Sequence, residues 1–141
     1  MEGEVALVDK DGLESACRSD PLRVQLLPCA IEADCSAKVD QFFETSVRST
    51  RSDGAELHSA SFRGRPLKGS DVHLPSKYTG FVLEKNDVDD QKRFDVRGSF
   101  TKFRQWNLDC RPSSNDTIQK AISWLSLAEA VHGPLEQDSS Q

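Results

Sequence analysis

The sequence predicts a mainly β fold, α+β overall, in which a small barrel-like sheet is followed by short C-terminal helices. Apolar and polar residues alternate in several short runs, as they do along half-buried strands. Turns rich in glycine and proline separate these runs at short intervals, which is typical of a small barrel or sandwich. With 141 residues, the chain is expected to form one domain around one sizeable core.

Residues 1–20 mix acidic, small and polar types with only a short apolar run, so we expect a flexible N-terminal arm. The alternation from Leu22 to Leu26 predicts a strand, which Pro28 ends or kinks. The domain is therefore assigned to residues 21–133. The polar residues 134–141 are expected to form a disordered tail.

A second strand is predicted over residues 39–47, around the adjacent aromatic residues Phe42 and Phe43. Neighbouring side chains on a strand point to opposite faces, so both faces of this strand should be covered. Asp53-Gly54 is a strong signal for a tight turn, and residues 57–62 are expected to return from it as a strand.

Residues 61–69 concentrate the least ordinary local chemistry of the chain, and we call them the basic corner. Arg63, Arg65 and Lys68 lie there beside Gly64 and other residues that require the chain to turn. Arginine forms paired hydrogen bonds with both phosphates and carboxylates. The corner therefore suits either an anionic or nucleic-acid ligand or a partner protein.

Further strands are predicted over residues 71–74, 78–83 and 94–100. The residues 84–93 lack a core-forming pattern and are expected to form a charged loop. Beyond the last strand the aromatic spacing slips to Phe103 and Trp106, which predicts a bulge that redirects the chain.

The last ordered segment is predicted to be helical, with Asp116 and Gln119 as a capping box and Gly133-Pro134 as the stop signal. Its apolar residues occupy two faces. One face carries Ile118, Ala121, Ile122 and Leu125, and the other carries Trp124, Leu127, Ala128 and Val131. This change of face predicts two short helices with a break over residues 123–126.

Composition argues against several classes of function. The formal net charge of -5 does not favour non-specific binding to nucleic acid or to a membrane. An acidic N-terminus and the lack of a long apolar run predict a soluble intracellular protein. The four cysteines include no Cys-x-x-Cys pair and the three histidines lie far from them in sequence, which argues against structural zinc.

No catalytic residue, metal site or cofactor is predicted for this chain. Its densest carboxylate cluster, Asp87, Asp89 and Asp90, lacks the spacing of a calcium loop, so a solvated loop is expected rather than the centre of a stand-alone hydrolase. Neither a nucleophile elbow nor a glycine-rich phosphate loop is present in the sequence.

Residues 100–106 interleave aromatic and basic side chains, as in proteins whose aromatic rings stack on single-stranded bases. The possible nucleic-acid contacts are Lys102, Arg104 and, in the basic corner, Lys68. An ordinary strand that buries its aromatic residues and exposes its cations would have the same pattern. A small barrel that binds single-stranded nucleic acid is therefore the alternative to the interpretation that follows.

Several landmarks, in this order, resemble those of the C subunit of ribonuclease H2. They are Leu26-Leu27-Pro28-Cys29, Phe42-Phe43, Ser61-Phe62-Arg63-Gly64-Arg65-x-Leu67-x-Gly69, Gly80-Phe81-Val82, Phe103-x-x-Trp106-x-Leu108, and Trp124-x-Ser126-Leu127 with Ala130-Val131-His132. The resemblance extends over residues 22–132.

The resemblance implies a non-catalytic scaffold subunit of the heterotrimeric ribonuclease H2 complex, which acts in the nucleus in DNA replication and repair. In that family, the catalytic A subunit supplies the carboxylates and the divalent metal ions. The complex degrades the RNA of RNA:DNA hybrids and cuts at single ribonucleotides embedded in DNA. The B and C subunits interweave into a compound triple barrel, and the C subunit lies between the other two. This chain would meet the hybrid through the complex.

The candidate partner-interface residues fall in three segments. They are Leu26, Leu27 and Pro28; Phe62, Arg63, Gly64 and Arg65; and Trp124, Leu127 and Val131. The chain departs from the family pattern in a shorter charged segment over residues 85–93 and in Leu125, where a proline is common. Leu125 is expected to extend the first C-terminal helix.

Overall fold

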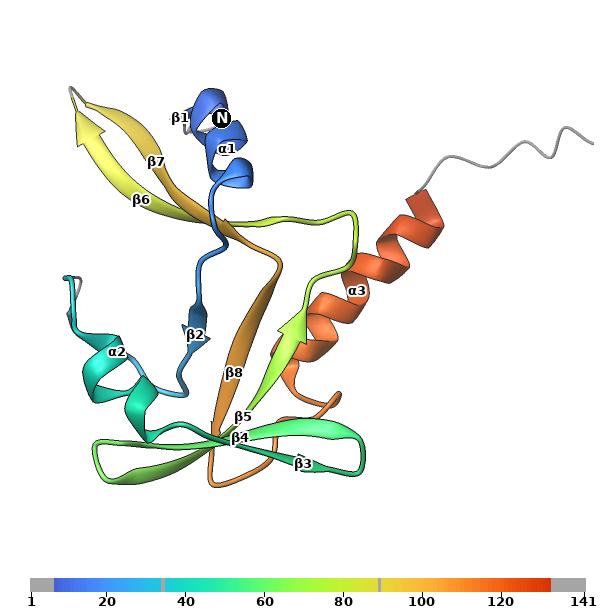
Figure 1. Cartoon of the computed structure of the whole chain (residues 1–141). Coiled ribbons are helices and arrows are strands. Elements are labelled where there is room, and N and C mark those ends of the chain that lie inside the picture. Colours follow the sequence, from blue (N-terminus) through green and yellow to red (C-terminus); the bar gives the residue numbers. More distant parts are fainter. Residues whose placement is uncertain (1–6, 34, 89, 133–141) are drawn as a thin grey trace, which may run out of the picture.

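The computed structural model describes residues 7–33, 35–88 and 90–132, which form two open sheets with one helix near each end (Figure 1). The smaller sheet has the order β1-β7-β6, with β1 at Leu7–Val8, β7 at Gln91–Phe100 and β6 at Gly80–Val88. The larger has the order β2-β8-β5-β4-β3, with β2 at Val24–Leu26, β8 at Lys102–Leu108, β5 at Arg65–His73, β4 at Ala55–Phe62 and β3 at Arg48–Ser52. The mainly β prediction is confirmed, but the described residues form no closed barrel.

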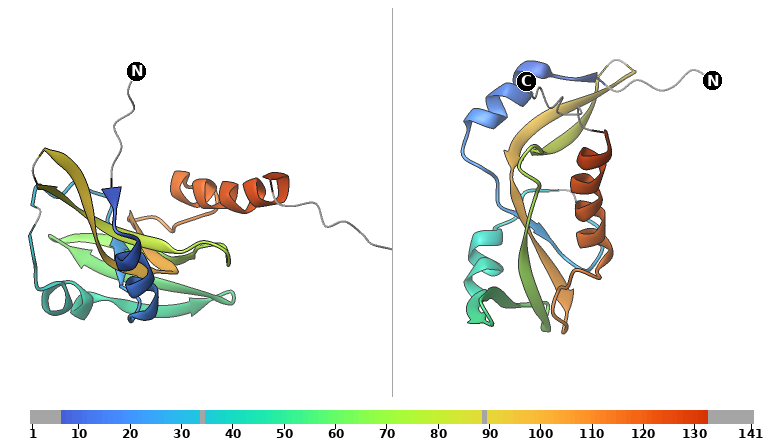
Figure 2. Two further views of the ribbon diagram at one scale, coloured as in Figure 1. Left: turned by 90° about the horizontal axis from the view of Figure 1, so that it is seen from above. Right: turned by 90° about the vertical axis from the view of Figure 1, so that its right-hand side faces the viewer.

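The chain crosses between the two sheets three times, and the crossing from β7 to β8 is the shortest of the three (Figure 2). Only Thr101 separates β7 from β8. Two backbone hydrogen bonds hold this joint: the Leu74 amide donates to the Thr101 carbonyl at 2.9 Å, and the Leu22 amide donates to the Ser99 carbonyl at 2.8 Å. The redirection predicted beyond residue 100 is therefore a passage from one sheet into the other.

Two tight turns organise the larger sheet. The Asp53-Gly54 turn joins β3 to β4, and the Arg63-Gly64 turn joins β4 to β5. The φ angles are 53° and 78° in the first turn and 51° and 75° in the second, as expected for two-residue hairpin turns of type I′. The predicted turn at Asp53-Gly54 and the predicted strand at residues 57–62 are confirmed.

The core lies on one face of this larger sheet and is centred on Trp106, whose exposed fraction is 1%. Phe43 meets the indole edge-on at a centroid distance of 5.6 Å, and the indole N–H donates to Gln25 Oε1 at 2.7 Å. Gly69 lies opposite Trp106 in the β5–β8 ladder. A Cβ atom at Gly69 would lie 2.6 Å from the ring, so the ring needs a glycine there.

The strand predicted over residues 39–47 is wrong. The chain forms a short helix, α2 (Val39–Phe42), and a 3₁₀ turn, η1 (Glu44–Ser46). Local hydrogen bonds explain the difference, because the Ser46 hydroxyl donates to the Phe43 carbonyl at 2.8 Å. This path buries Phe43 in the core and leaves Phe42 80% exposed, so the expected cover on both faces is absent from the described chain.

The N-terminal arm is structured from Leu7 onward, contrary to the prediction for residues 1–20. Asp9 caps the helix α1 (Lys10–Arg18) by accepting a hydrogen bond from the Asp11 amide at 3.1 Å. The Ser99 hydroxyl donates to the Ala16 carbonyl at 2.9 Å and so ties α1 to β7. The predicted tail at 134–141 lies outside the described residues.

The charged loop predicted over residues 84–93 is also wrong, because β6 and β7 pair as far as Val88 and Gln91. Cross-strand polar contacts stabilise this end of the hairpin, where residues 84–93 lack apolar alternation. Asn86 donates to Asp95 at 2.9 Å, and Arg97 forms an ion pair with Glu84.

The predicted break in the C-terminal helix is wrong, since α3 is one helix from Thr117 to His132. Leu125 in place of proline agrees with this continuity. The Tyr78 hydroxyl donates to the Leu125 carbonyl at 3.4 Å and Lys77 pairs with Glu129, which fastens one side of α3 to the segment before β6. No helix among the described residues is both long and apolar enough to span a membrane.

The capping box predicted at the start of α3 is replaced by contacts with β8. The Asp116 carboxylate accepts hydrogen bonds from Asn107 at 2.8 Å, from Gln105 at 3.0 Å and from the Ser113 amide at 3.1 Å. Gln119 donates to Gln105 at 3.1 Å. These bonds lower the pKa of Asp116, with the Ser113 amide as the largest cause. The stop signal at Gly133-Pro134 lies outside the described residues.

Candidate subunit-interface surfaces

The basic corner is a rigid turn that presents two arginines. Arg63 and Gly64 both have positive φ, and Arg63 lies over the Phe62 ring at 5.2 Å from its centroid. Arg65 is opposite Phe62 in the β4–β5 ladder. Within the described part of the chain, neither Arg63 nor Arg65 has an ion-pair partner, so both guanidinium groups remain available for another molecule.

The segment after β2 lies beside this corner. Pro28 shares a pocket with Phe62, Arg63 and Arg65, so two of the three predicted interface segments meet in space. Leu26 and Leu27 instead line a second cavity together with the start of α3. Leu27 also packs against the core, whereas Leu26 is largely exposed.

The outer face of α3 carries an apolar stripe that the described residues leave uncovered. Trp124 and Val131 are each 66% exposed, and Leu127 is 50% exposed. Their spacing of three and four residues places them on one side of the helix. The half-buried residues Ile122 and Leu125 belong to the other side. The two apolar faces predicted for this segment are thus two sides of one straight helix.

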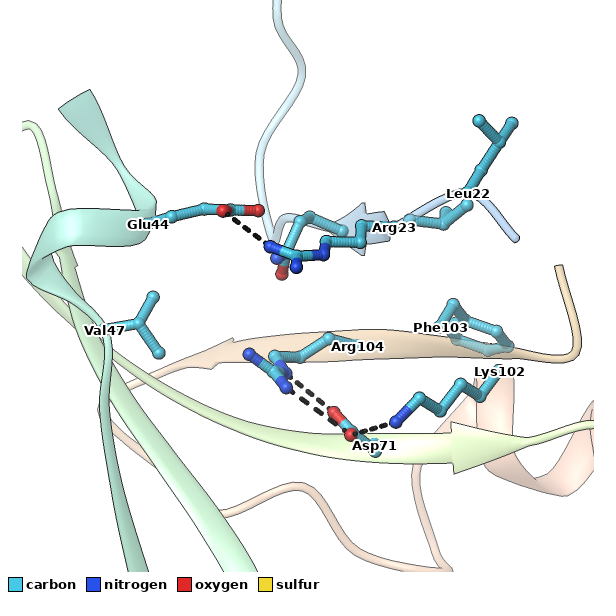
Figure 3. A pocket seen from close by; sticks show the side chains of 10 residues that line it. Leu22, Arg23, Glu44, Val47, Asp71, Lys102, Phe103 and Arg104 are labelled. Carbon is cyan, nitrogen blue, oxygen red and sulfur yellow. Dashed lines mark hydrogen bonds and ion pairs between the residues drawn. The ribbon is translucent and has the colours of Figure 1, made fainter. Parts of the chain in front are cut away.

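Lys102 and Arg104 contact a carboxylate of this chain (Figure 3). Arg104 Nε donates to Asp71 Oδ1 at 2.6 Å, and Lys102 Nζ lies 3.4 Å from Asp71 Oδ2. A cavity of about 360 Å³ opens above them, and Arg23 and Glu44 form an ion pair of 3.2 Å on its other side. The two carboxylates offset much of the positive charge that a phosphate would require.

His58 lies behind this ion-pair cluster with only 3% of its surface exposed. Ser49 Oγ lies 2.8 Å from Nδ1, and Asp71 Oδ1 lies 3.5 Å from Nε2. Burial, and then the charge of Arg104, lower the pKa of His58 below its usual 6.5, although Asp71 opposes them. Burial alone would raise the pKa of Asp71, but the hydrogen bond and charge of Arg104 outweigh it and lower that pKa.

The prediction that residues 100–106 form a platform on which single-stranded bases stack is wrong. Phe103 and Trp106 are buried, so their rings cannot stack on bases. Lys68 is exposed opposite Ser59 and Asn107, on the face of the sheet away from the core. The predicted cations therefore do not converge with an aromatic surface.

The cluster of His58 and Asp71 has no signal in the sequence pattern. These residues lie on neighbouring strands, and only the pairing of His58 with Gly69 in the β4–β5 ladder brings them together. Among the described residues, no three His, Cys, Asp or Glu side chains are placed to hold a metal ion. Asp89 of the predicted carboxylate cluster lies outside the described residues.

Comparison with known proteins identifies the family. The family model described as "Ribonuclease H2 non-catalytic subunit (Ylr154p-like)" matches residues 23–92. The chain is 33% identical to the C subunit of ribonuclease H2 from Mus musculus, over 84% of this chain and 85% of that protein. It is 32% identical to the C subunit from Bos taurus over the same shares of each chain. An uncharacterized Schizosaccharomyces pombe protein is 29% identical over 84% of this chain and 88% of its own length. The chain therefore belongs to the C-subunit family of ribonuclease H2, whose members are non-catalytic subunits of that enzyme.

Proposed function

We propose that this chain is the scaffold subunit of a nuclear, heterotrimeric ribonuclease H2, in which it holds the catalytic A subunit and the B subunit together. The complex would degrade the RNA of RNA:DNA hybrids and cut at single ribonucleotides embedded in DNA during replication and repair. The carboxylates and divalent metal ions for this reaction would belong to the catalytic subunit. The contribution of this chain is then assembly and positioning.

The observation that carries this proposal is the amount of apolar surface that the chain leaves exposed. The stripe on α3 places a tryptophan, a leucine and a valine in solvent, and Phe42 in α2 is 80% exposed. Figure 1 shows α2 and α3 on opposite sides of the molecule. Large exposed apolar patches mark protein interaction sites. The outer edges of β3 and β6 are also open in the described sheets, which supports an interwoven arrangement with the B subunit because an open edge can accept a further strand.

Co-expression with the A and B subunits of the same organism tests the proposal. We expect the three chains to elute together in size-exclusion chromatography and to cleave an RNA:DNA hybrid, while the isolated chain cleaves nothing. The same experiment with the isolated chain and single-stranded DNA or RNA tests the alternative function, and no salt-dependent binding is expected. A well-folded monomer that recruits neither of the other subunits would refute the proposal.

A further inference from the structure

A small pocket lies between the basic corner and the segment that follows β2. Its volume is about 240 Å³, below the range of about 300–1,000 Å³ that is usual for small-molecule sites. Pro28, Phe62, Leu67 and Leu108 give it an apolar lining. We call it the corner pocket. Its size suits one large apolar side chain better than a cofactor or metabolite.

Two cations stand at this apolar pocket. Arg63 and Arg65 line it, both are exposed, and neither has an ion-pair partner in the described part of the chain. Stacking of Arg63 on the Phe62 ring holds the guanidinium in place and leaves its in-plane N–H groups free to donate. A carboxylate that arrives beside an apolar anchor would therefore find paired donors already positioned.

We propose that the corner pocket binds an extended acidic segment of one of the partner subunits, which inserts an apolar side chain between Pro28 and Phe62 and places a neighbouring Asp or Glu against Arg63 and Arg65. The inference rests on the proposed function, since it names the chemistry by which one partner of that complex is recognised. Apolar anchors in desolvated pockets supply most of the binding energy of interfaces, and charges at the rim supply specificity.

The alternative occupants fit less well. A phosphate would meet the two arginines but would lose hydration against the apolar lining without gaining contacts from it. The C-terminal residues of the chain follow α3, and Figure 1 shows α3 leading away from the β4–β5 turn toward the opposite side of the molecule. The turn itself is fixed by positive φ at both central residues, which favours a preformed site over one that folds around its ligand.

The pocket can be blocked without disturbing the core. Ala30 lines it and is exposed, so Ala30→Phe fills the space with an aromatic ring while leaving buried residues unchanged. Arg65→Glu reverses a rim charge, and Arg18→Glu is the matched control because Arg18 is an exposed arginine at the end of α1 in the other part of the molecule. Circular dichroism would verify that each variant is folded.

Binding of these variants to the A and B subunits is then measured by titration at several salt concentrations. We expect Ala30→Phe and Arg65→Glu each to weaken binding at least about tenfold, and Arg18→Glu to change it less than about twofold. Ala30→Phe should keep the salt dependence of the wild type, whereas Arg65→Glu should reduce it, because only the second removes a rim charge. Equal affinities for all three variants would overturn the inference.

Cross-linking identifies the occupant directly. Cys29 lines the pocket and is exposed, and Cys17, Cys35 and Cys110 can be replaced by serine so that only Cys29 carries a small diazirine label. Photolysis of the assembled complex should join Cys29 to a peptide, from either of the other two subunits, in which an apolar residue adjoins Asp or Glu. A cross-link to a peptide without acidic residues, to this chain's own C-terminal residues or to a second copy of the chain would overturn the inference. If the wild-type chain forms no complex with those subunits, the proposed function falls and the inference falls with it, whereas an intact complex with an unoccupied pocket refutes the inference alone.

Discussion

Two glycines in equivalent turns allow a matched test of the basic corner. Gly54 and Gly64 have φ of 78° and 75°, and a Cβ atom added at either would meet no described atom within 4 Å. An alanine would therefore introduce backbone strain without a steric clash. The left-handed backbone conformation costs a non-glycine residue about 1–2 kcal/mol. Alanine also reduces the conformational entropy of the unfolded chain, which stabilises the folded state by about 0.4–1 kcal/mol. Each substitution should therefore destabilise the chain by about 1 kcal/mol.

The two variants should differ in assembly. We expect the turn with Gly64→Ala to relax in the free chain and to displace Arg63 and Arg65, so that it must be restored when a partner binds. Up to about 1 kcal/mol would then be lost from binding, which is about a fivefold weaker affinity. None of the pockets described above is lined by Asp53 or Gly54, and Gly54→Ala should leave the affinity unchanged.

Three measurements separate these effects. Thermal unfolding of the isolated chain should show similar decreases in Tm for both variants, of about 2–6 °C. Titration against the partner subunits should distinguish them, and turnover of an RNA:DNA hybrid per assembled complex should be normal for both. An equal loss of affinity in the two variants would refute the reasoning. So would a lower turnover by the intact Gly64→Ala complex at unchanged affinity.

Three further predictions concern the core, the buried histidine and α3. In urea unfolding, Gly69→Ala should destabilise the chain by about 1–3 kcal/mol, because the new Cβ would clash with the buried Trp106 ring. A loss below about 0.5 kcal/mol would show that the ring can move to accommodate it. The pKa of His58 is lowered in the folded chain, so the unfolded chain binds more protons and the free energy of unfolding should decline as pH falls below about 6.5. The variant His58→Gln should flatten that decline. An unchanged pH profile would contradict the assignment of this pH dependence to His58. Trp124→Ser should change unfolding by less than about 0.5 kcal/mol and yet weaken assembly, since the ring is exposed in the free chain, and normal assembly would exclude Trp124 from the interface.

Local signals predicted part of this fold correctly. Asp53-Gly54 forms a two-residue turn because its residues tolerate positive φ, and the strand expected to return from it has His58, Ala60 and Phe62 on its more buried face. The pattern around Phe42 and Phe43 was misleading. In a helical turn, as in a strand, one of two adjacent aromatic residues can enter the core while the other faces solvent. The sequence pattern therefore does not distinguish the two structures.

Other features depend on contacts between distant residues. The Asn86 and Asp95 contact stabilises the end of the β6–β7 hairpin, where residues 84–93 lack apolar alternation, and it can be identified only once the strand register is known. The helix α3 carries apolar residues on two sides, and the described residues leave the side with the apolar stripe exposed. Phe62 and Arg63 were proposed as interface candidates because their turn chemistry is local. The cluster at His58 and Asp71 could not be found in the same way.

Because only Thr101 separates β7 from β8, a small rotation of the backbone there would be amplified along the length of β7. Ten residues of extended chain reach about 33 Å, so a rotation of about 10° at the joint would displace the far end of the β6–β7 hairpin by at most about 6 Å. Two amide hydrogen bonds, from Leu74 and Leu22, resist that rotation in the isolated chain, as do the other two chain segments that cross between the sheets. A partner that bound both sheets at once would fix the angle between them, so the two sheets would then move as one rigid body.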